Sequence, residues 1–232
     1  MLELPILFLD EHLLVVDKPP GLPTLPDGYD KRAPCLIDLL KQQYGRLWVV
    51  HRLDKETSGV IILARSAEIH RALNMAFDSR EVRKVYDAIV IGVPHWNECT
   101  LDLPLRPDGD RRHRTVIDRQ RGKPAITRLQ VIERFRQNAL IEARPETGRT
   151  HQIRAHLAAI DLPLAGDALY GSRDAAASIA RTALHARSIE LQHPATHVPL
   201  HVEAPHPPDF ARALQQLRGH PGRVMIESCY DD

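Results

Sequence analysis

The feature that most constrains this chain is residues 50–63, where a charged segment runs directly into a short apolar one. Val60 to Leu63 is a β-branched, apolar run, which predicts a buried strand. The Thr57-Ser58-Gly59 sequence before it is typical of a turn. Arg52 and Asp54 are two positions apart, and in an extended chain such residues point to the same face. The segment therefore predicts a guanidinium and a carboxylate held beside a core strand, as reactive groups often are. A solvated surface pair of little energetic consequence explains the same two residues.

Composition narrows the classes to which the chain can belong. The 232 residues carry a net charge of +1, so an anionic partner must be met by a local patch rather than by the whole molecule. No apolar run approaches the roughly 18 residues of a membrane span, and the N-terminus lacks the basic start of a secretory signal. Cys35, Cys99 and Cys229 are odd in number and widely spaced, which favours a reducing cytoplasm over a disulfide framework. The 13 histidines lack the spacing of metal ligands, so we expect no metal site.

Apolar and alternating runs predict the secondary structure of most of the chain. Strands are predicted at residues 6–9, 13–16, 60–63, 84–92, 125–135 and 139–143. Helices are predicted at residues 34–44, 66–79, 150–160 and 207–217. Ser66 and Thr150 are the expected N-caps of the second and third helices, since a hydroxyl can accept a hydrogen bond from a free N–H of the first turn.

The charge changes character between Arg106 and Arg136. This segment holds ten Lys or Arg and four acids, a local net charge of +6 in a chain whose total is +1. Its first part, which includes Arg111, Arg112 and Arg114, has the composition of a hairpin loop. Arginine dominates over lysine, and arginine suits phosphate and stacked-base contacts, so we interpret the loop as facing RNA. A solvated loop without a ligand would carry similar charges.

Residues 146–157 place two arginines around the predicted start of the third helix. Arg149 lies beside that start, where free N–H groups and the helix dipole favour an anion, and we expect it to contact RNA. Arg154 lies one turn further in and adjoins the apolar stripe of the helix. A buried arginine requires a carboxylate partner, and the residues alone do not identify it.

Three of these segments together resemble the RluA family of pseudouridine synthases. Residues 51–59 (HRLDKETSG) resemble the signature motif of the family, residues 84–86 (KVY) its second motif, and residues 148–154 (GRTHQIR) its third. Further similarity is present at residues 18–22, 162–171 and 184–194. The resemblance runs from about Asp10 to Phe210. The chain most resembles the short, RluA-type members, which modify both large-subunit ribosomal RNA and a tRNA anticodon stem-loop.

The resemblance implies the fold, the reaction and the setting. The fold is the α+β pseudouridine synthase fold, a long, mainly antiparallel sheet with flanking helices and a central RNA-binding cleft, and the predicted short strands agree with it. Residues 1–232 are expected to form a single catalytic domain without a separate N-terminal RNA-binding domain. The expected function is isomerisation of specific uridines to pseudouridine in structured RNA. We expect a cytoplasmic monomer that needs no metal or organic cofactor and does not enter a membrane.

The resemblance also implies roles for five residues. Asp54 is the catalytic aspartate, which either attacks ribose C1′ or assists loss of the C2′ proton, and Arg154 is its partner. The ring of Tyr86 lies against the target base, although the residue by itself is typical of a half-buried core tyrosine. Leu184 lines the base pocket, or is a plain core leucine. Arg52 enters the RNA stack in place of the extruded uridine.

Two other functions remain open. A glycosidase-like hydrolase of nucleosides or nucleic acid also uses a carboxylate at an anomeric carbon. It needs a second carboxylate, which Glu56 or Glu146 would have to supply. A non-catalytic RNA-binding module or chaperone would use the segment from Arg106 to Arg136 alone. Released free uracil would indicate the hydrolase, and full function after loss of Asp54 would indicate the binding module.

Overall fold

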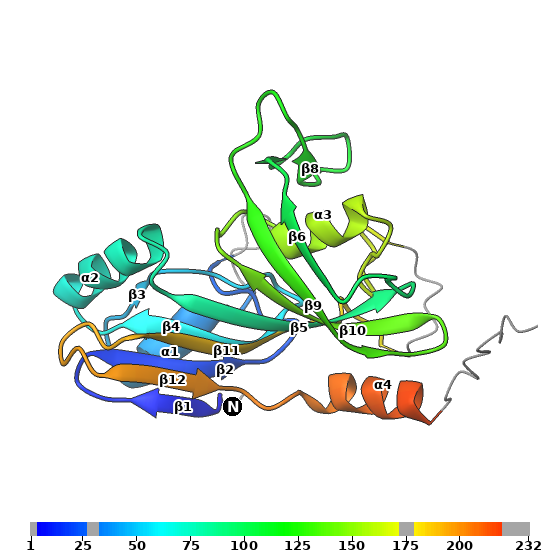
Figure 1. The fold of residues 1–232 in the computed structure, drawn as a ribbon. Coiled ribbons are helices and arrows are strands. Elements are labelled where there is room, and N and C mark those ends of the chain that lie inside the picture. The colour runs from blue at the N-terminus through cyan, green and yellow to red at the C-terminus, as the bar shows by residue number, and fades with distance from the viewer. Residues whose placement is uncertain (1–3, 27–32, 172–178, 220–232) are drawn as a thin grey trace, which may run out of the picture.

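The computed structural model describes residues 4–26, 33–171 and 179–219. Within this part of the chain, ten strands form one sheet in the order β1-β2-β4-β11-β5-β10-β9-β6, with β3 added to β4 and β12 to β11 (Figure 1). The strands are β1 (Ile6–Leu9), β2 (Leu13–Lys18), β3 (Trp48–Val49), β4 (Ser58–Ala64), β5 (Arg83–Ile91), β6 (Glu98–Asp102), β7 (Leu105–Arg106), β8 (Val116–Ile117), β9 (Ile126–Arg134), β10 (Asn138–Pro145), β11 (Leu184–Gln192) and β12 (Pro199–Glu203). The helices are α1 (Leu36–Tyr44), α2 (Ala67–Asp78), α3 (Gln152–Ala159) and α4 (Pro208–Arg218).

Antiparallel pairing dominates the sheet. Among the described strands, the one parallel pair is β4 with β11, where Ser58 lies opposite His185 and Gly59 opposite Ala186. Although β11 comes late in the chain, it lies between β4 and β5 and so joins the two halves of the sheet. The predicted α+β fold, with a long, mainly antiparallel sheet and flanking helices, is confirmed.

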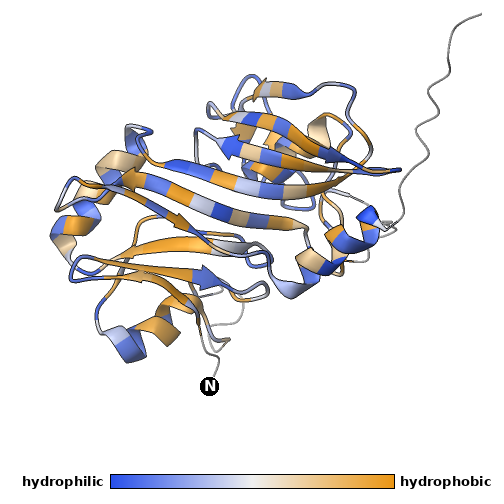
Figure 2. Cartoon of the chain, turned by 60° about the horizontal axis from the view of Figure 1, so that its bottom comes forward, coloured by the Kyte–Doolittle hydropathy of each residue, from blue (hydrophilic) through white to orange (hydrophobic). Residues whose placement is uncertain are grey.

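The strand β4 is buried on both faces, as its apolar run predicts. Val60 and Ile62 point into one core cluster, in which the apolar side chains of α2 pack. Ile61 and Leu63 point into the opposite cluster, in which α1 packs. The two helices therefore cover opposite faces of this half of the sheet, and each fully buried aliphatic side chain contributes roughly 1.5–3 kcal/mol. Figure 2 shows strands coloured orange through most of their length beside longer strands in which orange and blue alternate.

The structure confirms most of the predicted element boundaries. The helix predicted from Ser66 is α2, and the Ser66 hydroxyl accepts a hydrogen bond from the N–H of Ile69 at 3.2 Å. The predicted terminal helix is α4, which has Pro208 at its first turn, where the missing N–H costs nothing. The strands predicted at residues 125–135 and 139–143 are β9 and β10, joined by a tight connection.

The turn predicted at residues 57–59 is wrong for its last two residues. Ser58 and Gly59 belong to β4, while the turn lies at residues 55–56 and is closed by a hydrogen bond from the N–H of Thr57 to the carbonyl oxygen of Asp54 at 3.1 Å. Gly59 has φ 111°, and a Cβ at this position would lie 2.1 Å from the carbonyl oxygen of Ala186. The glycine is therefore required by the close approach of β11, and not by a turn.

A small second sheet, formed by β7 and β8, stands apart from the main one at the top of Figure 1. Residues 107–115 connect its two strands and are called the Arg-rich loop below. The base of this hairpin is anchored because Leu105 and Ala125 pack on Ala155 of α3. The predicted hairpin loop is confirmed. Its base packs on α3, the helix that begins within the third motif.

Candidate active site

The three motif segments meet around one open cavity of about 470 Å³. Its walls are the connection between β3 and β4, the first half of β5, the segment from the end of β10 into α3, and the start of β11. The predicted site residues that line it are Arg52, Asp54, Tyr86, Arg149, Arg154 and Leu184. The Arg-rich loop contributes no residue to this lining among those described.

Asp54 lies in a loop that is fixed from below by backbone hydrogen bonds. The Thr24 hydroxyl donates to the carbonyl oxygen of Leu53 at 3.0 Å and accepts from the N–H of the same residue at 3.2 Å. The N–H of Gly21 donates to the carbonyl oxygen of Lys55 at 2.9 Å. Both neighbours of Asp54 are thus bonded to the segment that follows β2, so the position of its backbone is set by the scaffold.

Lys18, at the end of β2, completes this support; its segment, residues 18–22, resembles the family, but the role of its side chain was not predicted. Its side chain is fully buried, and its ammonium donates to the carbonyl oxygens of Pro19, Leu22 and Lys55 at 2.9, 2.8 and 3.1 Å. Burial lowers the pKa of Lys18 to about 7, although the charge of Glu56 opposes the shift. Three acceptors match the three N–H groups of an ammonium, so this lysine ties two loops together.

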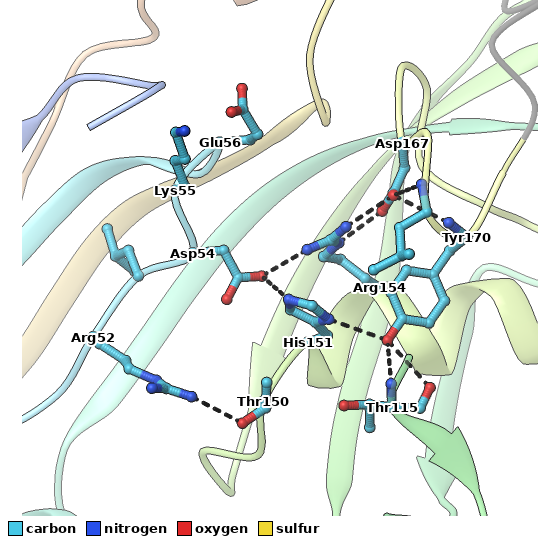
Figure 3. A network of polar contacts seen from close by, with 12 residues as sticks. Arg52, Asp54, Lys55, Glu56, Thr115, Thr150, His151, Arg154, Asp167 and Tyr170 are labelled. Carbon is cyan, nitrogen blue, oxygen red and sulfur yellow. Dashed lines mark hydrogen bonds and ion pairs between the residues drawn. The ribbon is translucent and has the colours of Figure 1, made fainter. Parts of the chain in front are cut away.

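Arg154 lies between two carboxylates. Its Nη1 is 3.2 Å from Oδ2 of Asp54, which places the pair as the resemblance implied. Its Nε and Nη2 bind Oδ2 and Oδ1 of Asp167 at 2.7 and 2.9 Å (Figure 3). The Asp167 side chain is fully buried, whereas that of Asp54 is 25% exposed. Burial opposes the charge of Arg154, but the hydrogen bonds and charge of Asp167 outweigh it and raise the pKa of the guanidinium. The stronger partner of Arg154 is therefore Asp167, which leaves Asp54 open to a ligand.

The start of α3 differs from the prediction by one residue, because His151 and not Thr150 is its N-cap. His151 has φ 52°, in the left-handed region, and makes no side-chain cap bond. The Thr150 hydroxyl instead accepts a hydrogen bond from Nη2 of Arg52 at 3.0 Å. This backbone turn brings Nε2 of His151 to 3.8 Å from Oδ2 of Asp54. Burial lowers the pKa of His151, although the charge of Asp54 opposes the shift, so the ring is neutral at pH 7.

A chain of polar contacts runs from His151 to the Arg-rich loop, as Figure 3 shows. The Tyr170 hydroxyl lies 3.2 Å from Nδ1 of His151 and accepts a hydrogen bond from the N–H of Thr115 at 2.8 Å. The guanidinium of Arg154 lies over the Tyr170 ring, 5.1 Å from its centre. Asp167 and Tyr170 fall in the segment 162–171, whose similarity to the family was the signal that could have identified them.

Tyr86 lies on β5 between two small residues, Ala143 of β10 and Ala186 of β11. Because neither neighbour has a long side chain, the ring lines the floor of the cavity. Burial raises the pKa of Tyr86, and the negative charge of Asp54 adds to the shift, so the phenol stays neutral. Leu184 is 4% exposed, lines the cavity and packs in a core cluster, so both of its predicted roles agree with its position.

The arginines predicted to contact RNA differ in their exposure and in their partners within the protein. Arg52 and Arg149 are exposed at the cavity, and Arg149 donates from Nε to the carbonyl oxygen of Pro124 at 3.1 Å. In the Arg-rich loop Arg111 is exposed, and Arg112 donates to the carbonyl oxygen of Ala168 at 3.1 Å. Arg114 pairs with Asp110 at 2.6 Å, so much of its charge is neutralised within the loop itself. Their contact with RNA stays a prediction.

In residues 4–26, 33–171 and 179–219, no group of three or more His, Cys, Asp or Glu side chains is placed to hold a metal ion. Over the same ranges, none of the helices is long and apolar enough to cross a membrane.

Comparison with known proteins identifies the family. A family model described as RNA pseudouridylate synthase matches residues 12–159. The chain belongs to this family. It is 40% identical to the ribosomal large subunit pseudouridine synthase D of Pseudomonas aeruginosa, over 94% of this chain and 72% of that protein. It is 38% identical to the dual-specificity RNA pseudouridine synthase RluA of Escherichia coli, over 82% of this chain and 87% of that protein.

Solved structures of family members share the fold. The human RNA pseudouridylate synthase domain containing 4 superposes with a TM-score of 0.75 at 30% identity, covering 92% of this chain and 93% of its own. The human RNA pseudouridylate synthase domain containing 1 gives a TM-score of 0.73 at 25% identity. Membership of the pseudouridine synthase family and its fold, predicted from three short motifs, are thereby confirmed.

Proposed function

We propose that this pseudouridine synthase isomerises specific uridines in large-subunit ribosomal RNA, in a tRNA anticodon stem-loop, or in both, with Asp54 as its catalytic carboxylate. The observation that carries the proposal is the position of Asp54, which is held by Arg154 on one side and by a fixed backbone below, yet is open to the cavity. The names of the two relatives support an RNA substrate, since one is a ribosomal large subunit pseudouridine synthase and the other a dual-specificity RNA pseudouridine synthase. The tRNA anticodon stem-loop comes from the resemblance to the short family members.

The reaction breaks the bond from ribose C1′ to uracil N1, turns the base and joins C1′ to C5. The proton on C5 is then lost and N1 takes up a proton, so the product is an isomer of uridine. A single aimed carboxylate serves this reaction, either as the nucleophile at C1′ or as the base that removes the C2′ proton, and both routes fit an open Asp54. The neutral ring of Tyr86 gives a stacking surface on which the detached uracil can turn. Arg154 holds the Asp54 carboxylate from the side of α3, and the ring of His151 lies beside it.

Arg52 is placed to replace the uridine in the RNA stack. Flipping a nucleotide out of structured RNA costs a few kcal/mol, and a side chain that fills the gap offsets part of this cost. The Arg52 guanidinium is exposed, reaches to Thr150 across the cavity, and makes no ion pair with Asp54 among the described residues. An arginine that is held by a single hydroxyl can leave it for a base stack at small cost.

The hydrolase alternative loses support from the positions of its two candidate carboxylates. Glu146 lines the cavity but pairs with Arg128 at 2.6 Å and with Arg80 at 3.6 Å. Glu56 does not line the cavity, and in Figure 3 its carboxylate points away from that of Asp54. The binding-module alternative explains the Arg-rich loop but not the buried charges that are assembled around Asp54.

The test is to map pseudouridines in ribosomal RNA and tRNA from cells with and without the gene. Cells that carry the Asp54→Asn variant are the matched control, because the change keeps the shape of the side chain. We expect loss of pseudouridine at defined uridines, restored by the intact chain and not by Asp54→Asn. Restoration by Asp54→Asn would overturn the proposed role of the carboxylate. We place the reaction in the cytoplasm, where both RNA classes are found, and propose that the chain acts as a monomer.

A further inference from the structure

The cavity contains a half-buried cation, Lys84, that the reaction as described does not use. Lys84 and Tyr86 are two residues apart on β5, so their side chains point to the same face, and both line the cavity. Two residues of a strand span roughly 6.6 Å. This is comparable to the separation between a uracil ring and a phosphate of its own nucleotide.

The ammonium of Lys84 is unpaired in a way that the neighbouring cations are not. Arg154 has two carboxylate partners, Arg52 a hydroxyl and Arg149 a carbonyl oxygen. Among the described residues, Lys84 makes neither an ion pair nor a hydrogen bond, and its ammonium lies over the ring of Phe77, whose centre is 5.7 Å from Nζ.

The groups around Lys84 do not compensate its charge. His51 stacks on Phe77 with ring centres 5.0 Å apart, and its Nε2 accepts a hydrogen bond from the N–H of Ile62 at 3.1 Å. Burial, and after it the charge of Lys84, lowers the pKa of His51 to about 3, so this ring is neutral and uses its lone pair elsewhere. Tyr86 is neutral as well. The exposed Asp78 of α2 lines the cavity without pairing with Lys84.

A desolvated ammonium without an anion is costly, and a ligand that supplies the anion recovers that cost. Burial already lowers the pKa of Lys84 to about 8. The contact with Phe77 is weak compensation, since a cation over a phenylalanine face contributes roughly 0.5–1 kcal/mol at such sites. An RNA substrate brings one negative charge for each nucleotide, and a base on Tyr86 brings its own phosphate close to this lysine.

We propose that Lys84 binds a backbone phosphate of the flipped-out target nucleotide, and so fixes the nucleotide while its base turns on Tyr86. The inference rests on the proposed RNA substrate and adds a phosphate-binding position to the cavity. It differs from a purely structural role, in which the lysine would only cover Phe77.

The test compares Lys84→Met, which keeps the length of the stem, with Lys84→Arg, which keeps the charge. The matched control is Lys41→Met on α1, an exposed lysine that lies outside the cavity. Binding is measured in the Asp54→Asn background, so turnover does not interfere. The probes are a tRNA anticodon stem-loop and a large-subunit RNA fragment that contain a mapped uridine. Each is also made with a neutral methylphosphonate on the 5′ or the 3′ side of that uridine.

We expect Lys84→Met to bind the natural RNA about tenfold more weakly, as loss of one charged hydrogen bond predicts. One of the two methylphosphonates should weaken binding of the parent chain by the same factor and should cost Lys84→Met nothing further. The slope of log Kd against log salt should fall by about 0.7 for Lys84→Met, the value for one contact to a single strand. From pH 7 to pH 9 the parent chain should lose affinity as its ammonium deprotonates, and Lys84→Arg should not.

Two results would overturn the inference. One is an unchanged RNA affinity of Lys84→Met. The other is a methylphosphonate that weakens the binding of Lys84→Met as much as that of the parent chain. Equal melting temperatures of Lys84→Met and Lys41→Met exclude a folding defect, and retained affinity of Lys84→Arg provides a second check. Turnover is measured in parallel with Asp54 intact. If the parent chain turns over RNA and Lys84→Met binds RNA equally well, the phosphate contact alone is refuted. If RNA binding depends on Lys84 but the parent chain shows no turnover, the proposed reaction alone is refuted.

Discussion

Replacement of Arg154 by methionine should separate the structural role of this residue from its role beside Asp54. The substitution keeps an apolar stem of similar length but removes three hydrogen bonds, two to Asp167 and one to Asp54. Since Asp167 is fully buried, its carboxylate would be left without a cation. Breaking a buried pair in this way costs about 3–5 kcal/mol.

The lower part of that range applies here. Oδ1 of Asp167 still accepts hydrogen bonds from the N–H groups of Leu169 and Tyr170 at 3.0 and 3.2 Å, and Asp54 is partly exposed. We therefore expect the free energy of unfolding to fall by about 3 kcal/mol. For a chain of this size that corresponds to a drop in melting temperature of roughly 6–12 °C.

The measurement is urea unfolding of the wild type, Arg154→Met and the double variant Arg154→Met/Asp167→Asn, with turnover assayed on the same samples. The amide of Asp167→Asn keeps an oxygen for the two N–H groups but carries no charge, so the double variant should recover part of the lost stability. Its turnover should stay low because Asp54 still lacks its guanidinium. Arg128→Met is the control, an exposed arginine whose loss should cost less than 1 kcal/mol. An unchanged urea midpoint for Arg154→Met, with an unchanged m-value, would refute the reasoning.

Three further predictions concern residues that support the site. Gly59→Ala should lower the melting temperature strongly, because its Cβ would lie 2.1 Å from a backbone oxygen of Ala186, and an unaltered melting curve would contradict this. Lys18→Met should lower the free energy of unfolding by about 1–3 kcal/mol, since three carbonyl oxygens lose their donor. The pKa of Lys18 is about 7 in the folded chain and 10.5 in the unfolded chain, so between these values the unfolded chain binds more protons than the folded chain. The stability of the wild type therefore rises with pH in this range. Its difference from Lys18→Met, measured by urea unfolding, should widen from pH 7 to pH 10. Tyr170→Phe keeps the ring but removes the hydroxyl beside His151. Steady-state kinetics should give a kcat lower by about threefold to tenfold, with unchanged RNA affinity. An unchanged kcat would show that this hydroxyl does not help to position the site.

Local sequence signals predicted the parts of the fold that depend on local physics. The apolar run from Val60 to Leu63 predicted a buried strand, and Ser66 predicted the start of a helix. Signals that depend on distant contacts were misread. Gly59 is typical of a turn, yet it is needed because β11, far along the chain, passes within contact of its backbone. Thr150 is a good N-cap by composition, but its hydroxyl is occupied by Arg52 from another element.

The site shows the same division. The carboxylate of Asp54 and its pairing with Arg154 followed from motif resemblance, because both residues lie within recognisable segments. The roles of Asp167 and Lys18 did not follow, although both lie in segments that resemble the family, because the resemblance there gave no contact for either side chain. Lys18 begins a Pro/Gly segment that resembles a family element or is a plain loop, and neither interpretation predicts that its ammonium is buried among carbonyl oxygens, as the structure shows.

The position of β11 has a consequence for the order of events during synthesis. Asp54 precedes β4 and Tyr86 lies in β5, but these two strands do not pair with each other in the described sheet, because β11 lies between them. When β1 to β5 have emerged from the ribosome, the nascent chain therefore contains both residues but lacks β11, the strand that connects β4 with β5. At about 5–20 residues per second, β11 follows after several seconds of further elongation. The cavity can assemble only when that late strand inserts, so catalytic competence is withheld until residues 184–192 have been translated.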